Sequence, residues 1–148
     1  SGCRAAEVSG IERAEIDWNR RAVIVMGKGS KQREVYFGAK ALIWLRRYVA
    51  SRKDDHPALF ATEKGSIGPL LPRQVWWVVK RVAAHAGMRA RIWPHLLRHT
   101  LATTLLNQGA PLVAVQSILG HSRSETTLIY ATLSGSSRQQ AYQRHFVQ

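Results

Sequence analysis

The sequence predicts an α+β protein that is mainly α-helical and carries a small three-stranded antiparallel sheet near its N-terminus. Three short extended segments, with turn residues between them, occupy residues 15–37, and apolar residues recur at helical spacing from residue 39 onward. The chain has 148 residues, of which 45% are hydrophobic. A chain of this size and composition can bury a core, so we expect a folded domain rather than a disordered segment.

The three expected strands follow one another closely. Residues 15–18 are a short extended candidate, residues 21–26 are β-branched and apolar, and residues 33–37 form the third segment. Residues 27–31 supply Gly, Lys and Ser for a turn. We therefore expect an antiparallel hairpin with Lys28 at its tip.

Helices are expected before and after this sheet along the chain. Proline at a first helical position and glycine just after a last one mark most of their boundaries. The expected helices are a short turn at residues 4–8, then 39–51, 72–87, 94–109 and 111–119. Ser122 and Glu125 match a capping box for one more helix, which carries Tyr130. The tail from Ser134 either docks as a short helix or frays.

The charge balance indicates the class of partner. The chain has 22 Lys and Arg against 9 Asp and Glu, a formal charge of +13, and a pI near 11.1. Such a protein attracts polyanions, and nucleic acid is the first candidate. A membrane surface is disfavoured because the basic residues form no block beside an amphipathic helix. A basic protein without a specific partner is the alternative that composition leaves open.

Other features exclude several classes of protein. No apolar run approaches the roughly 20 residues that span a bilayer, and the first residues mix small and charged side chains, unlike a signal peptide. Cys3 is the single cysteine, so an internal disulfide and a cysteine-cluster metal site are both excluded. A reducing cytosol is compatible with this composition.

Four residues in the last third could act together on a phosphodiester: His95, Arg98, His121 and Tyr130. Arginine binds phosphate oxygens in a bidentate way, histidine moves protons near neutral pH, and tyrosine can form a covalent intermediate. His95 and Arg98 share a helix face, and Pro94 puts His95 at a helix N-terminus that favours anions. Each also has a structural interpretation: a capping histidine, a solvated arginine, a turn histidine and a core tyrosine.

Two rival functions remain open from these residues. Residues 111–131 resemble a helix-turn-helix, in which the second helix reads the major groove, so a non-catalytic DNA-binding regulator is possible. His95 and His99 have a spacing that zinc sites use, which would suit a metal-dependent nuclease. Leu96 stands where metalloproteases keep a glutamate, so we expect no metal site and a buried, hydrogen-bonded His99.

Together with two upstream segments, these residues resemble the tyrosine recombinases, the family of phage integrases and Xer-type resolvases. The segment 1–7 looks like the family's first box, 27–33 like its lysine hairpin, 95–100 like its second box, and 119–122 like the next histidine motif. Tyr130 sits where the family keeps its nucleophile. The resemblance implies the catalytic residues Arg4, Lys28, His95, Arg98, His121 and Tyr130, with Glu7 and His99 in support.

The resemblance also implies a reaction. Tyr130 attacks a DNA phosphate to give a 3′-phosphotyrosyl link, while Arg4 and Arg98 bind the phosphate oxygens. Lys28 protonates the leaving 5′-oxygen, His95 accepts the tyrosine proton and His121 donates a hydrogen bond. Recombination or integration by this route needs no cofactor, metal ion or ATP.

The same resemblance implies an organisation and a setting. Residues 1–148 would form a single catalytic domain, truncated at its N-terminus and lacking the family's core-binding domain. The tail 134–148 would pack on its own domain or be exchanged between protomers. The partners would be double-stranded DNA and, in the full-length protein, three further copies in a tetramer, with no membrane or small-molecule substrate. The setting would be the cytoplasm of a bacterium, with a bacterial, phage or mobile-element gene.

Overall fold

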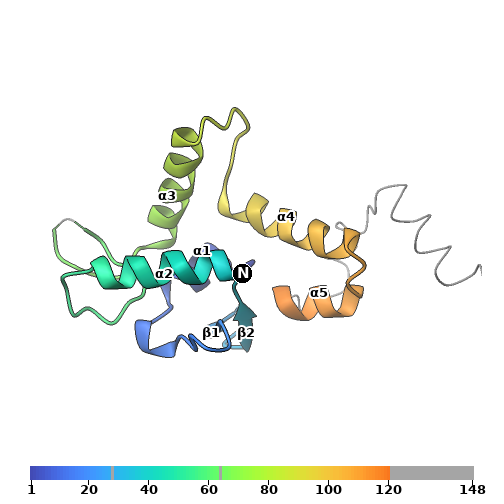
Figure 1. Cartoon of the computed structure of the whole chain (residues 1–148), viewed down its shortest axis with the longest axis horizontal. Coiled ribbons are helices and arrows are strands. Elements are labelled where there is room, and N and C mark those ends of the chain that lie inside the picture. The colour runs from blue at the N-terminus through green and yellow to red at the C-terminus, as the bar shows by residue number, and fades with distance from the viewer. Residues whose placement is uncertain (28, 64, 121–148) are drawn as a thin grey trace, which may run out of the picture. The chain divides into compact units, whose positions relative to one another are not determined.

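The computed structural model describes residues 1–27, 29–63 and 65–120 of the chain (Figure 1). Its helices are α1 (Ala5–Ser9), α2 (Ala39–Ser51), α3 (Pro72–His85), α4 (Pro94–Asn107) and α5 (Leu112–Leu119), and its strands are β1 (Ala22–Met26) and β2 (Gln32–Tyr36). The described residues divide into two compact units, one with Ser1 and the described part of Cys3–Leu96, and one with Gly2 and the described residues from Leu97 to Gly120. The predicted class, mainly α with a small antiparallel sheet, is confirmed.

The sheet of the described part has two strands, so the prediction of a third strand at residues 15–18 is wrong. β1 and β2 pair antiparallel from Ala22↔Tyr36 to Met26↔Gln32. Asp17 forms only an isolated bridge with Ala22, and its Oδ1 accepts the N–H groups of Asn19 and Arg20 at 3.0 and 2.8 Å. This side-chain turn returns the chain to β1 at once, which leaves no room for an extended strand.

The core of the first unit forms on one face of the hairpin. Val23, Val25 and Val35 are buried there, because alternate strand residues point to the same face. Buried apolar residues from the neighbouring loops, among them Ile16 and Leu59, complete the cluster.

α2 and α3 begin where the sequence predicts. α2 has the predicted bounds, and its residues Leu45 and Val49 pack against the core, whereas Trp44 is exposed. α3 ends at His85, two residues before Gly87, whose φ of +67° suits glycine. α1 packs against α3 and β1.

The second unit has its own core between α4 and α5. Ala102, Leu106, Val115 and Leu119 are buried together. α5 ends at Gly120, whose left-handed φ of +65° stops the helix. The predicted helices at 94–109 and 111–119 are thus confirmed to within two residues at their ends. Within the described ranges every helix is too short or too polar to cross a membrane.

Candidate active site

Arg4 and Glu7 form one connected group at the start of α1. Arg4 is the N-cap residue, and its backbone N–H donates to Glu7 Oε2 at 2.7 Å. Its Nη1 donates to Glu7 Oε1 at 2.9 Å. The side chain of Glu7 is 2% exposed and that of Arg4 is 38% exposed. A buried carboxylate therefore anchors a guanidinium that reaches solvent, where it can meet an anion.

Arg33 on β2 is a second cation on the same carboxylate, and sequence reasoning missed it because it assigned this residue only to a strand. Its Nη2 donates to Glu7 Oε2 at 2.7 Å, and its side chain is 11% exposed. One carboxylate thus holds two guanidinium groups by charge-assisted hydrogen bonds. The signal in the sequence was an arginine two residues before Val35, on the strand face that points inward.

The base of the hairpin lies beside this carboxylate. The Gly27 N–H donates to the Lys31 carbonyl at 2.8 Å. A Cβ at Gly27 would lie 3.2 Å from that carbonyl oxygen and 3.8 Å from Glu7 Oε1. Gly29 and Ser30 have left-handed φ values of +73° and +57° and make the turn. Lys28, the predicted catalytic lysine, lies outside the described residues.

Arg98 is buried in the second unit, with 1% of its surface exposed. Its Nη1 donates to the Gly2 carbonyl at 2.6 Å, and its Nη2 donates to the Leu119 carbonyl. Gly2 has a φ of +66°, and a Cβ there would lie 2.9 Å from the side chains of Leu101 and Leu119. The interpretation of Arg98 as a solvated arginine is therefore wrong, because the guanidinium ties two backbone segments to α4.

The two histidines of α4 differ in exposure. His95, in the first turn, is exposed, and His99 is half-buried rather than fully buried as predicted. Among the described residues no group of three or more His, Cys, Asp or Glu side chains could hold a metal ion. His121 and Tyr130 lie outside the described residues, as do Ser122, Glu125 and the tail 134–148. Arg4, Glu7, Arg33 and His95 belong to the first unit and Arg98 to the second.

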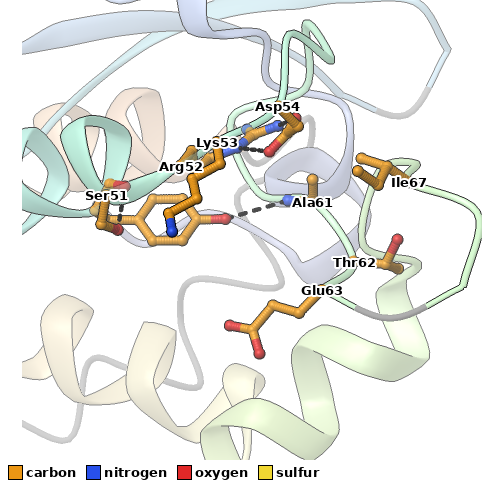
Figure 2. Close-up of a pocket in the computed structure, with 9 residues that line it drawn as sticks. Ser51, Arg52, Lys53, Asp54, Ala61, Thr62, Glu63 and Ile67 are labelled. Carbon is orange, nitrogen blue, oxygen red and sulfur yellow. Dashed lines mark hydrogen bonds and ion pairs between the residues drawn. The ribbon is translucent and has the colours of Figure 1, made fainter.

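A pocket of about 400 Å³ lies beside the C-terminal end of α2. Figure 2 shows Ser51–Asp54 on one wall and Ala61–Glu63 with Ile67 on the other. Its most buried cation, Arg52, is bound to Asp54 through Nε at 2.9 Å and through Nη2. The Arg52 guanidinium is thus engaged within the protein, and none of the described residues predicted to be catalytic lines this pocket.

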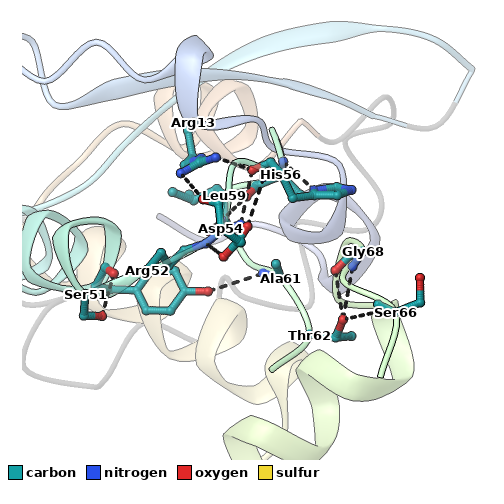
Figure 3. A network of polar contacts seen from close by, with 12 residues as sticks. Arg13, Ser51, Arg52, Asp54, His56, Leu59, Ala61, Thr62, Ser66 and Gly68 are labelled. Carbon is teal, nitrogen blue, oxygen red and sulfur yellow. Dashed lines mark hydrogen bonds and ion pairs between the residues drawn. The ribbon is translucent and has the colours of Figure 1, made fainter. Parts of the chain in front are cut away.

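Arg52 and Arg13 instead hold the loop at residues 54–59 (Figure 3). Arg52 Nη1 donates to the carbonyls of Ala58 and Leu59, the latter at 3.1 Å. Arg13 Nη2 donates to the His56 carbonyl at 2.6 Å. The hydrogen bond from Arg52 lowers the pKa of the Asp54 carboxyl to about 2. This network positions Leu59 in the core of the first unit.

The Asp54 carboxylate is expected to make stability depend on pH. A folded pKa of about 2 lies below the value of about 3.9 in an unfolded chain. The contribution is therefore complete above pH 4 and is lost as the pH falls toward 2. In urea titrations, Asp54→Asn should be less stable than the wild type at pH 5 and nearly equal to it at pH 2. Asp55→Asn, at the exposed neighbouring residue, is the control, and the same pattern there would contradict the prediction.

Three comparisons with known proteins agree on one family. Residues 1–136 match the model of the phage integrase family. The tyrosine recombinase XerC of Corynebacterium glutamicum is 41% identical over 147 aligned positions, which cover 97% of this chain and 47% of that protein. The crystal structure of the XerA recombinase has a TM-score of 0.83 at 26% identity and covers 99% of this chain and 54% of its own.

The crystal structure of the XerH site-specific recombinase, bound to a palindromic difH substrate in a post-cleavage complex, is also similar. It has a TM-score of 0.74 at 27% identity, with coverage of 96% of this chain and 42% of that one. The chain spans about half the length of the curated relatives it matches.

Proposed function

Because the chain belongs to the phage integrase family, we propose that it is the catalytic part of a site-specific recombinase that cleaves and rejoins DNA strands. One observation carries the proposal. The family match over residues 1–136 includes all six predicted catalytic residues in the family's order: Arg4, Lys28, His95, Arg98, His121 and Tyr130. The XerC and XerH proteins named above are recombinases of this kind.

In the proposed reaction, Tyr130 Oη forms a bond to the phosphorus as the bond from phosphorus to the 5′-oxygen breaks. His95 accepts the tyrosine proton, and Lys28 gives a proton to the leaving 5′-oxygen. A 5′-hydroxyl of a partner strand then attacks the 3′-phosphotyrosyl link and releases Tyr130. Because the energy of the cleaved bond is kept in this link, the cycle requires no ATP.

The phosphate is proposed to be bound by Arg4 and Arg98, with a hydrogen bond from His121. The carboxylate of Glu7 holds the Arg4 guanidinium at a position that reaches solvent, where it can donate charge-assisted hydrogen bonds to a phosphate. Positive charge from fixed side chains stabilises the pentavalent transition state in place of a metal ion. We therefore propose no metal and no cofactor for the reaction.

Double-stranded DNA is the proposed substrate. The chain has no Asp or Glu between Glu63 and Glu125. The described part of this stretch exposes several basic side chains, namely Arg73, Lys80, Arg81, Arg89 and Arg91. A long segment with positive charge and no acidic residue is suited to a polyanion. The XerH complex with a DNA substrate supports the same choice.

We further propose that residues 1–148 act as one catalytic domain in the bacterial cytoplasm, and that four full-length copies assemble on DNA. In that assembly the tail 134–148 would dock on its own protomer or on a neighbour. Relatives such as XerC are about twice as long as the matched segment. The activity is therefore assayed with the N-terminal half of such a relative fused to this chain.

The test is the capture of a covalent protein–DNA adduct. The chain, alone and fused to the N-terminal half of XerC, is incubated in EDTA with a pool of nicked duplexes of randomised sequence. A nick beside the cleavage site lets the short 5′-hydroxyl strand diffuse away and traps the adduct on a denaturing gel. Tyr130→Phe should abolish the adduct because it removes the attacking oxygen, and Tyr142→Phe, the control, should keep it.

Two other outcomes would contradict the proposal, and each favours one of the rival functions. Reversible DNA binding that is unaffected by Tyr130→Phe and gives no adduct in either form would favour the helix-turn-helix regulator. DNA cleavage that EDTA stops and that depends on His99 would favour a metal-dependent nuclease.

A further inference from the structure

The charged side chain of Arg33 is nearly buried, which is costly unless its donors are paired. It is 11% exposed, and its Nε and Nη1 atoms are buried with no hydrogen-bond partner among the residues that the structure describes. A buried donor without an acceptor lowers stability. Fold stability alone therefore does not account for a guanidinium at this position.

The side-chain ion pair of Arg33 leads to a predicted phosphate ligand. Glu7 Oε2 accepts both Arg33 Nη2 at 2.7 Å and the Arg4 backbone N–H at 2.7 Å. Glu7 Oε1 accepts Arg4 Nη1 at 2.9 Å. Arg33 and Arg4 thus share a carboxylate that is 2% exposed.

Arg33 restricts the rotation of the Glu7 carboxylate about its terminal side-chain torsion. The terminal torsion of a glutamate side chain has a broad energy profile, and the contacts from Arg4 come from the start of the same short helix, so they do not tie the carboxylate to the sheet. Arg33 is anchored in the β1–β2 ladder opposite Val25. Its bond to Oε2 therefore fixes the carboxylate plane to the sheet, and the plane in turn fixes Arg4 Nη1.

We propose that Arg33 is a positioning residue for DNA cleavage, which acts through Glu7 to hold the Arg4 guanidinium in line with the scissile phosphate. This inference rests on the proposed function. Arg33 does not touch the phosphate; it reduces the spread of positions of the group that does. Displacing a positioned group by about 1 Å can lower a rate by about 100-fold.

The test measures adduct formation with the nicked duplexes at saturating DNA. Arg33→Met should lower the first-order rate about 10- to 100-fold and leave the DNA concentration at half-saturation nearly unchanged, because positioning acts on the transition state. Arg33→Lys keeps the charge and the fold and should recover part of the rate. The matched control is Arg20→Met, which removes an exposed cation paired with Glu34 on the same sheet and should leave the rate unchanged.

A double-mutant comparison separates positioning from a general structural role. In an Arg4→Lys background, Arg33→Met should slow adduct formation less than about twofold, because the group it positions has already been replaced. The same 10- to 100-fold loss in both backgrounds, or a wild-type rate for Arg33→Met, would overturn the inference. A wild type that forms no adduct would instead overturn the proposed function.

Discussion

Arg98→Met is expected to lower the free energy of unfolding by about 3 kcal/mol. The guanidinium is 1% exposed and donates to the carbonyls of Gly2 and Leu119. Methionine approximates the volume of the arginine stem but donates nothing, so the part-buried Gly2 carbonyl and the buried Leu119 carbonyl both lose a charged donor. Each such loss costs about 1–3 kcal/mol. Urea denaturation at neutral pH measures the change.

Two further variants test whether the lost stability comes from the buried hydrogen bonds of Arg98. Arg98→Lys keeps the charge, but a single ammonium replaces the planar fork and should not reach both carbonyls well, so an intermediate loss is expected. Arg89→Met removes an exposed arginine and should change stability by less than about 0.5 kcal/mol. An Arg98→Met protein as stable as Arg89→Met would show that the buried contacts contribute nothing.

Replacing Arg98 by lysine should also slow adduct formation. In the adduct assay we expect Arg98→Lys to react at least about 100-fold more slowly than the wild type, because a point charge replaces the guanidinium that we propose binds the phosphate. The comparison is made at a temperature where the Arg98→Lys protein is folded by circular dichroism. A wild-type rate there would limit Arg98 to a structural role.

The parts of the fold that were predictable depend on local rules. Pro72 and Pro94 begin α3 and α4, and Gly120 ends α5 in a left-handed conformation. The missing third strand was not predictable from apolar pattern, because the competing structure is a side-chain turn made by Asp17. A four-residue extended pattern cannot show which of its polar atoms will cap a turn.

The candidate site shows the same division between local and distant contacts. Arg4 and Glu7 are three residues apart, and the family resemblance, carried by this short segment, indicated them as a supporting pair. Arg33 joins Glu7 from 26 residues away, and Arg98 joins Gly2 from 96 residues away. Such contacts depend on how the hairpin and α4 pack, which no short window of sequence contains. The roles of Lys28, His121 and Tyr130 come from the family resemblance and stay predictions.

The two described arginines of the predicted site are held by different means, which has a mechanistic consequence. The Arg4 guanidinium is bound to a carboxylate, whereas Arg98 donates to two neutral carbonyls. A carboxylate partner lowers the positive charge that Arg4 presents to a phosphate, whereas a neutral carbonyl partner does not cancel charge. The shared Glu7 is therefore expected to control both the position and the strength of the Arg4 contact.

Glu7→Gln is expected to lower the free energy of unfolding by about 2 kcal/mol. Removing one partner of a buried ion pair costs about 3–5 kcal/mol when the other charge is fully buried. Arg4 is 38% exposed, so solvent screens part of its charge and the expected loss is smaller. Most of the effect comes from Arg33, which is 11% exposed and would lose its carboxylate. Urea denaturation of Glu7→Gln measures it.

A second substitution identifies the origin of that loss. In the Glu7→Gln protein, Arg33→Met should restore about 1 kcal/mol, because it removes the buried cation that no longer has a carboxylate. Glu12→Gln, at an exposed position in the same unit, is the control and should change stability by less than about 0.5 kcal/mol. If Arg33→Met destabilises the Glu7→Gln protein further, the hydrophobic and backbone contacts of Arg33 outweigh its charge. The adduct rate should stay low in the double variant even where stability returns, since the Glu7 carboxylate and the Arg33 contact that we propose position Arg4 are both removed.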